Sequence, residues 1–171
     1  MRKLKFLLLF SFFGSINLLK SQNPWGFEAM VRSMLEEKVD TVGSDFIHEN
    51  LNNANLVLLD ARSEEEWEVS HLKGARRIGY DPFDPEVLKT VSKEATVVVY
   101  CSIGKRSEEV AAELKKMGYS DVKNLFGGIF DWTNRGYTVV NTQGTPVKQV
   151  HPYNALWGIW VNNYEKVDGS K

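Results

Sequence analysis

The chain has 171 residues, 43% of them hydrophobic and 25% charged, and its 21 basic and 22 acidic side chains give a net charge of −1 at pH 7. This length suffices for one domain with its own core, and the even charge balance argues against a nucleic-acid-binding protein. A single cysteine excludes an internal disulfide and a two-thiol, thioredoxin-like mechanism.

Residues 1–21 have the pattern of a secretory signal peptide. Arg2, Lys3 and Lys5 precede an uncharged, mostly apolar run at residues 6–19, which is too short to span a bilayer comfortably. We therefore expect an exported protein, periplasmic or secreted, without stable membrane insertion once the signal is cleaved. The alternative is that the segment stays as an uncleaved membrane anchor.

Residues 22–38 predict a helix that precedes the main domain. Its apolar side chains recur at helical spacing, with acidic residues on the other face: Phe27, Met30, Val31, Met34 and Leu35. We interpret this helix as packing on the edge of the domain, and the alternative is a helix that docks a partner.

Residues 39–140 predict one domain of alternating strands and helices. Short runs that predict strands occur at 39–42, 56–60, 75–78, 96–100 and 122–125, and those at 56–60 and 96–100 are mostly apolar. Ser63 and Glu66 have capping-box spacing for one helix, and Asp84 followed by Pro85 predicts the start of another that continues through Val91. This alternation indicates an α/β layered fold with a parallel sheet.

The lone Cys101 follows the most apolar of these runs, at the first position of a tight loop. A helical pattern begins at Ser107 and ends at Gly118. Backbone N–H groups that point into such a loop, together with the helix dipole, form an anion site and favour a thiolate at Cys101. We interpret Cys101 as a nucleophile that attacks an oxyanion substrate without a general base. The alternative is a buried structural cysteine.

The rest of the loop supplies the predicted substrate-binding residues. Gly104 permits the backbone turn, and the planar guanidinium of Arg106, placed just before the helix, suits a bidentate oxyanion contact. Lys105 either steers anions or is simply solvated. The predicted substrate-binding set is Ser102, Ile103, Gly104, Lys105, Arg106, Ser107 and Arg62.

Asp60 and Arg62 lie just beyond a strand, at the sheet edge where ligands bind in such folds. Arg62 could line the pocket, or the two residues could form a network that supports the loops. The histidines show no pairing with cysteine at metal-ligand spacing. We therefore expect neither a metal site nor a cofactor.

Residues 141–171 form a tail rich in aromatic side chains, among them Tyr153, Trp157, Trp160 and Tyr164. We expect this tail to pack on the domain as a hydrophobic cover. The alternative is a site for a partner or a membrane surface.

Four segments between residues 39 and 140 resemble motifs of the rhodanese-type sulfurtransferases, in the family's order. They read L-L-D-A-R-S-E-E-E-W (58–67), S-H-L-K-G-A (70–75), C-S-I-G-K-R-S (101–107) and N-L-F-G-G-I-F-D-W (124–132). The resemblance implies the single-domain rhodanese fold, an α/β fold with a central parallel sheet flanked by helices on both faces. It also implies that Asp60 has a supporting, structural role.

The resemblance further implies sulfur transfer through a persulfide on Cys101. The donor would be thiosulfate or a related small anion, the acceptor a thiol or cyanide, and the protein a monomer. Ser102 departs from the family, since an arginine often follows the cysteine. This could shift the choice of donor.

Two alternatives to sulfur transfer remain. Related phosphatases and arsenate reductases have five residues between cysteine and arginine, whereas Cys101 and Arg106 are separated by four. The other alternative is a non-catalytic rhodanese module that binds a partner or senses sulfur species.

Overall fold

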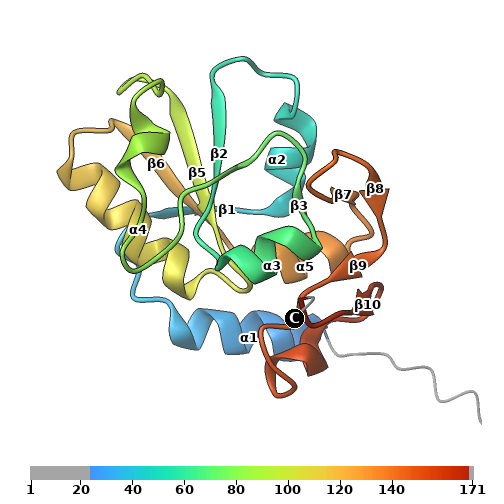
Figure 1. Cartoon of the computed structure of the whole chain (residues 1–171). Helices are drawn as coiled ribbons and strands as arrows, with labels where there is room; N and C mark the ends of the chain where they lie inside the picture. Colours follow the sequence, from blue (N-terminus) through green and yellow to red (C-terminus); the bar gives the residue numbers. More distant parts are fainter. Residues whose placement is uncertain (1–23, 170–171) are drawn as a thin grey trace, which may run out of the picture.

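A five-stranded parallel sheet forms the centre of the computed structural model, which describes residues 24–169 (Figure 1). Its strands are β1 (Asp40–Val42), β2 (Leu56–Asp60), β4 (Arg76–Arg77), β5 (Thr96–Tyr100) and β6 (Asp121–Leu125). They lie in the order β1-β6-β5-β2-β4, and every neighbouring pair is parallel. The central strand β5 is apolar along its length because both of its faces are covered. The predicted parallel sheet is confirmed.

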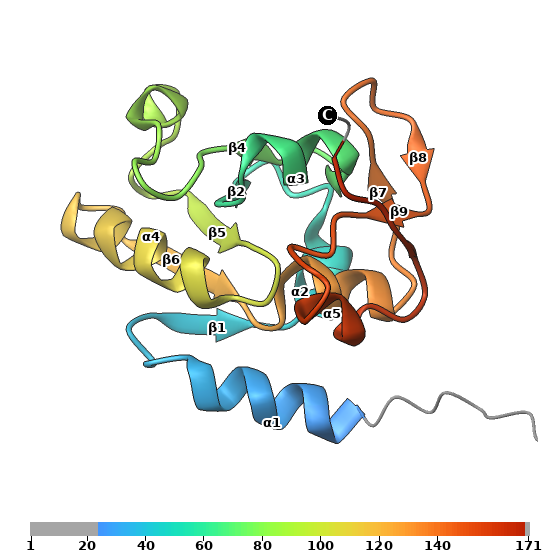
Figure 2. The ribbon, with the colours of Figure 1, turned by 60° about the horizontal axis from the view of Figure 1, so that its bottom comes forward.

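Helices cover both faces of this sheet, as predicted (Figure 2). The helical elements of the domain are α2 (Ser44–Asn50), α3 (Glu64–Val69), the 3₁₀ helix η1 (Pro85–Leu88), α4 (Lys105–Lys116) and α5 (Gly128–Asn134). Val99 of β5 belongs to one core cluster with Val110 and Leu114 of α4. Val98 points to the other face and belongs to a second cluster with Ile129 of α5.

Two predicted helices are shorter than the sequence pattern indicated. The first, α1, spans Pro24–Met34. Glu37, just beyond it, has a φ of 56°, a left-handed value that is incompatible with a right-handed helix. The segment after Asp84 forms η1 and then single turns instead of an α-helix through Val91. Its bonds from Lys89 N to Glu86 O and from Val91 N to Leu88 O are of the tighter i→i+3 type.

The start of α3 has the predicted capping box. The N–H of Glu66 donates to the hydroxyl of Ser63, and the N–H of Ser63 donates to the Glu66 carboxylate. Glu66 is therefore held at the N-terminus of α3 with its carboxylate buried.

The C-terminal segment packs on the face of the sheet that α2 and α5 cover (Figure 1). Its strands β7 (Val139–Val140) and β8 (Pro146–Val147) form a small sheet with β3 (His71–Leu72). A second pair consists of β9 (Gln149–Val150) and β10 (Glu165–Lys166). The 3₁₀ helix η2 (Trp157–Trp160) lies between β9 and β10 in the chain. Val150, Val161 and Tyr164 are buried in the same cluster as Ile129. Trp160 meets Phe27 of α1 with 5.7 Å between ring centroids.

The predicted signal peptide, residues 1–21, lies outside the described residues. Within residues 24–169, no helix has the length and apolar character needed to cross a membrane.

Candidate active site

Cys101 lies directly after β5, at the edge of the sheet where the parallel strands end. Its Sγ accepts a hydrogen bond from the N–H of Gly104 at 3.2 Å. Gly104 reaches this position with a φ of 111°, in a region that glycine enters without strain. The predicted order of strand, tight loop and helix is therefore confirmed. The side chain of Cys101 is 1% exposed.

The helix after the loop begins two residues earlier than predicted. Gly104 is its N-cap and α4 starts at Lys105, so Lys105 and Arg106 belong to the first helical turn. Because α4 has 12 residues, its dipole places partial positive charge close to the sulfur.

The guanidinium of Arg106 binds Glu66 of α3, which the sequence identified only as a helix cap. Nη1 and Nη2 of Arg106 donate to the two carboxylate oxygens at 2.7 and 2.8 Å. Ser102 joins them, because its hydroxyl donates to Glu66 at 2.8 Å and accepts from Arg106 at 3.0 Å. The group predicted to hold a substrate oxyanion is thus engaged with a carboxylate of the protein itself.

This ion pair stays charged over a wide pH range. Burial raises the pKa of Glu66, but the hydrogen bond and charge of Arg106, the charge of Arg62 and the N–H of Ser63 together lower that pKa to about 2. The pair fixes Ser102, the residue after the nucleophile, to the start of α3.

Arg62 lies inside the protein and does not line an accessible pocket. Its Nε and Nη2 bind Asp60 at 2.7 to 3.0 Å, and Nη2 also donates to the carbonyl of Ser70 at 2.6 Å. Both side chains are fully buried, and Nη1 of Arg62 has no protein partner. Of the two alternatives from the sequence, the structure contains the supporting network, which ties the end of β2 to the residue before β3.

The remaining loop residues also make structural contacts. Lys105 pairs with Glu36 at 2.5 Å, beside the connection from α1 to β1, and Ile103 packs in the core cluster. Ser107 donates to Oδ1 of Asn124 at 2.7 Å, and Nδ2 of the same amide donates to the carbonyl of Gly104 at 2.9 Å. Asn124 was not predicted as a site residue. Asn124 shares a strand face with the buried Val122, and a polar side chain on that face is the signal that could have found it.

The start of α5 is hydrogen-bonded to the backbone of the Cys101 loop. The N–H groups of Ile129 and Phe130 donate to the carbonyls of Cys101 and Ser102 at 2.9 and 3.1 Å. The loop is thus held on one side by α5 and on the other by Glu66.

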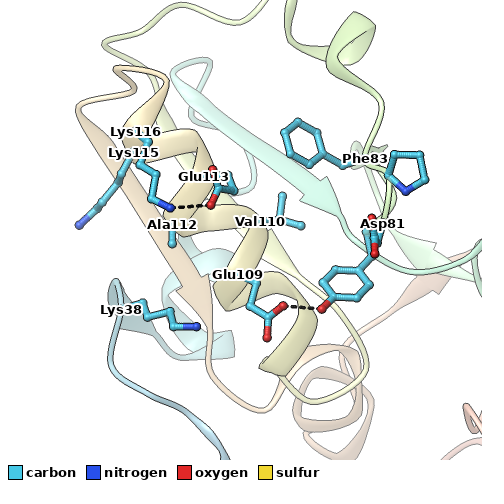
Figure 3. Close-up of a pocket in the computed structure, with 11 residues that line it drawn as sticks. Lys38, Asp81, Phe83, Glu109, Val110, Ala112, Glu113, Lys115 and Lys116 are labelled. Carbon is cyan, nitrogen blue, oxygen red and sulfur yellow. Dashed lines mark hydrogen bonds and ion pairs between the residues drawn. The ribbon is translucent and has the colours of Figure 1, made fainter.

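A groove of about 810 Å³ lies elsewhere, along α4 (Figure 3). It is lined by Lys38, Tyr80, Asp81, Pro82, Phe83, Glu109, Val110, Ala112, Glu113, Lys115 and Lys116. None of these is a predicted site residue, although Glu109 lies 3.7 Å from Lys105 of the loop. In the part of the chain that the structure describes, no cluster of histidine, cysteine or acidic residues is arranged to hold a metal ion.

Comparisons with known proteins identify the family to which this chain belongs. The family model described as "Rhodanese-like domain" matches residues 44–135, more than half of the chain. The probable adenylyltransferase/sulfurtransferase MoeZ of Mycobacterium tuberculosis is 38% identical over 81 residues, which are 47% of this chain and 21% of that protein. The tRNA uridine(34) hydroxylase of Salmonella newport is 31% identical over 107 residues, 60% of this chain and 29% of that protein.

The chain therefore spans about a fifth to three tenths of the length of these curated relatives. Among solved structures, the polysulfide-sulfur transferase homodimer of Wolinella succinogenes has a TM-score of 0.55 at 20% identity, covering 69% of this chain and 89% of that one. At this identity, the likeness shows a shared fold alone. The family model matches β2, β4, β5, β6, the Cys101 loop and α5, and the chain therefore belongs to the rhodanese-like domain family.

Proposed function

We propose that this protein is a sulfurtransferase that carries a sulfane sulfur from thiosulfate, or a related donor, to a thiophilic acceptor as a persulfide on Cys101. One observation carries the proposal: the only cysteine of the chain lies at a helix N-terminus, where the resemblance to the family implies the nucleophile, and its Sγ accepts the N–H of Gly104 at 3.2 Å. The thiolate is the reactive form of a cysteine, and backbone N–H groups and the positive end of a helix dipole interact favourably with negative charge.

The reaction divides into two half-reactions. The Cys101 thiolate attacks the outer sulfur of thiosulfate, an Sγ–S bond forms as the S–S bond of the donor breaks, and sulfite leaves with the bonding electron pair. A thiol or cyanide then attacks the outer sulfur of the persulfide, and Cys101 returns as the thiolate. The N–H groups of the loop and the dipole of α4 stabilise the charge on the transferred sulfur.

The contacts of Arg106 support a role in loop geometry rather than in direct binding of the donor. Its guanidinium is bound by Glu66 and is 20% exposed, so the donor would meet main-chain N–H groups first. Because Cys101 is 1% exposed, the first half-reaction also needs an opening step in the residues that cover the sulfur.

The proposal includes export and a monomeric state. The pattern of residues 1–21 supports export to the periplasm or the medium, where the acceptor would be a thiol. Neither a cofactor nor a metal takes part in the scheme.

The test is cyanide-dependent formation of thiocyanate from thiosulfate, measured on wild-type protein and on Cys101→Ser. We expect turnover in the wild type, ping-pong kinetics and no turnover in the variant. Aryl phosphate hydrolysis by the same preparation, without thiocyanate formation, would instead indicate a phosphatase. A folded wild-type protein inactive in both assays would indicate a non-catalytic module.

A further inference from the structure

We propose that Tyr153, in the C-terminal segment, is a positioning residue of the sulfurtransferase site, so that this segment and the rhodanese-like domain complete the site together. The inference rests on the proposed function. It concerns a residue beyond the matched residues 44–135.

Tyr153 packs on the residue that closes the Cys101 loop. Its ring centroid lies 4.9 Å from Cζ of Arg106, within the range of a cation–π contact. Cζ of Arg106 thus lies over the ring of Tyr153, while Nη1 and Nη2 of the same guanidinium donate to Glu66 and Ser102. A planar guanidinium can make both kinds of contact at once.

The backbone of Tyr153 is held in an uncommon conformation. Its φ is +65°, a left-handed value that is unusual for a bulky side chain. Its N–H donates to Nδ1 of His151 at 3.0 Å, and the next N–H, of Asn154, donates to the carbonyl of Pro152 at 2.8 Å. Strain of this kind persists only where the surrounding structure enforces it.

The turn that carries Tyr153 is anchored on both sides. Before it, Val150 is fully buried, and the carbonyl of Gln149 accepts from the hydroxyl of Ser70 at 2.7 Å. After it, the N–H of Gly158 donates to the carbonyl of Asn154 at 2.9 Å. The ring is thus presented to Arg106 by an ordered part of the fold, although it is itself 47% exposed.

These contacts place Tyr153 at one end of a chain of interactions that reaches the nucleophile. The Tyr153 ring contacts the guanidinium of Arg106, Arg106 binds Glu66 and Ser102, and Ser102 is bonded in sequence to Cys101. Without the ring, water competes for the guanidinium, the ion pair with Glu66 is weakened, and the loop loses its fixed geometry. The inference assigns Tyr153 an effect on the rate of sulfur transfer without contact to the reacting atoms.

The test compares four variants of the full chain with wild type in the thiosulfate and cyanide assay, measuring kcat and KM separately. Tyr153→Phe keeps the ring and should stay within about twofold of wild type. Tyr153→Leu keeps bulk without a π face and should lose about fivefold to tenfold in kcat/KM, the size expected for one cation–π contact. The matched control is Leu156→Ala, an exposed apolar side chain of the same segment, which should stay within about twofold.

Tyr153→Gly separates function from folding. Glycine adopts a positive φ without strain, which offsets part of the stability lost with the ring. This variant should therefore melt at a higher temperature than Tyr153→Leu and still lose activity like Tyr153→Leu. A second readout is the rate of Cys101 alkylation as a function of pH, whose profile should change in the glycine and leucine variants and not in Leu156→Ala.

The outcomes separate the two levels of the proposal. Wild-type protein that forms no thiocyanate overturns the proposed function itself. Active wild type, with glycine and leucine variants equal to the Leu156→Ala control, overturns the role of Tyr153. So does a gain of activity in those variants, because the ring would then be a barrier to the donor instead of a support for the loop.

Discussion

Gly128 is in backbone contact with Cys101, and a Cβ atom at position 128 would lie 2.2 Å from the carbonyl oxygen of Cys101. The same carbonyl accepts the N–H of Ile129 at 2.9 Å. Gly128, the second of two adjacent glycines, therefore allows α5 to approach the loop and fix the position of the nucleophile.

Gly128→Ala should destabilise the protein severely. The new methyl group collides with backbone that cannot move aside, and the φ of 54° adds strain. We expect the free energy of unfolding to fall by about 4 kcal/mol or more, measured by denaturant titration. Gly144→Ala is the matched control, because it has a φ of 75° and open space around its Cβ position. It should cost only about 1–2 kcal/mol, and equal losses at both sites would contradict the contact.

The Glu66–Arg106 pair makes stability depend on pH in the acid range. The pKa of Glu66 is lowered from 4.5 to about 2 in the folded protein. The folded state thus favours the carboxylate, and this contribution is complete above pH 4.5 and is lost as the pH falls toward 2. We expect the wild type to lose on the order of a few kcal/mol from this group over that interval.

Glu66→Gln tests this assignment. The variant should be less stable than wild type at pH 7 by about 2–3 kcal/mol, since it leaves Arg106 without its anionic partner. The difference between the two proteins should shrink as the pH falls through 4.5 toward 2. A difference that stays constant with pH would show that Glu66 is not the titrating group.

Arg62→Lys should reduce stability more than it reduces catalysis. Lysine cannot reproduce the contacts of Nε and Nη2 with Asp60 and Ser70, and a broken buried pair costs about 3–5 kcal/mol. The folded fraction should keep a KM for thiosulfate close to that of wild type, because Arg62 supports the loops from the interior. A large increase in KM with unchanged stability would show instead that Arg62 contacts the donor.

Asn124 should couple energetically to Ser107. The amide of Asn124 connects the Ser107 hydroxyl to the carbonyl of Gly104, so removal of either side chain disturbs the same loop. In a double-mutant cycle of Asn124→Ala and Ser107→Ala, we expect a coupling of about 1 kcal/mol in stability. Strictly additive losses would contradict the bridge.

The fold could be predicted largely from local patterns. Within the run at residues 96–100, residues 97–100 are buried in a parallel sheet, and the left-handed glycines at 104, 118 and 127 lie where the chain turns. The extent of η1 could not be predicted, because Pro85 and its cap begin an α-helix and a 3₁₀ helix equally well.

The site was only half predictable for a different reason. The place of Cys101 depends on its neighbours in sequence, whereas the partner of Arg106 depends on where α3 lies relative to α4 in the folded sheet. No local sequence pattern indicates how close α3 and α4 lie in the folded protein. The contact of Tyr153 with Arg106 depends in the same way on how the C-terminal segment returns across the domain.

The most direct test of the account is the intact mass of the purified protein after incubation with thiosulfate. We predict a gain equal to one sulfur atom, absent in Cys101→Ser and removed by cyanide. An unchanged mass in folded protein, or the same gain in Cys101→Ser, would contradict a persulfide on Cys101.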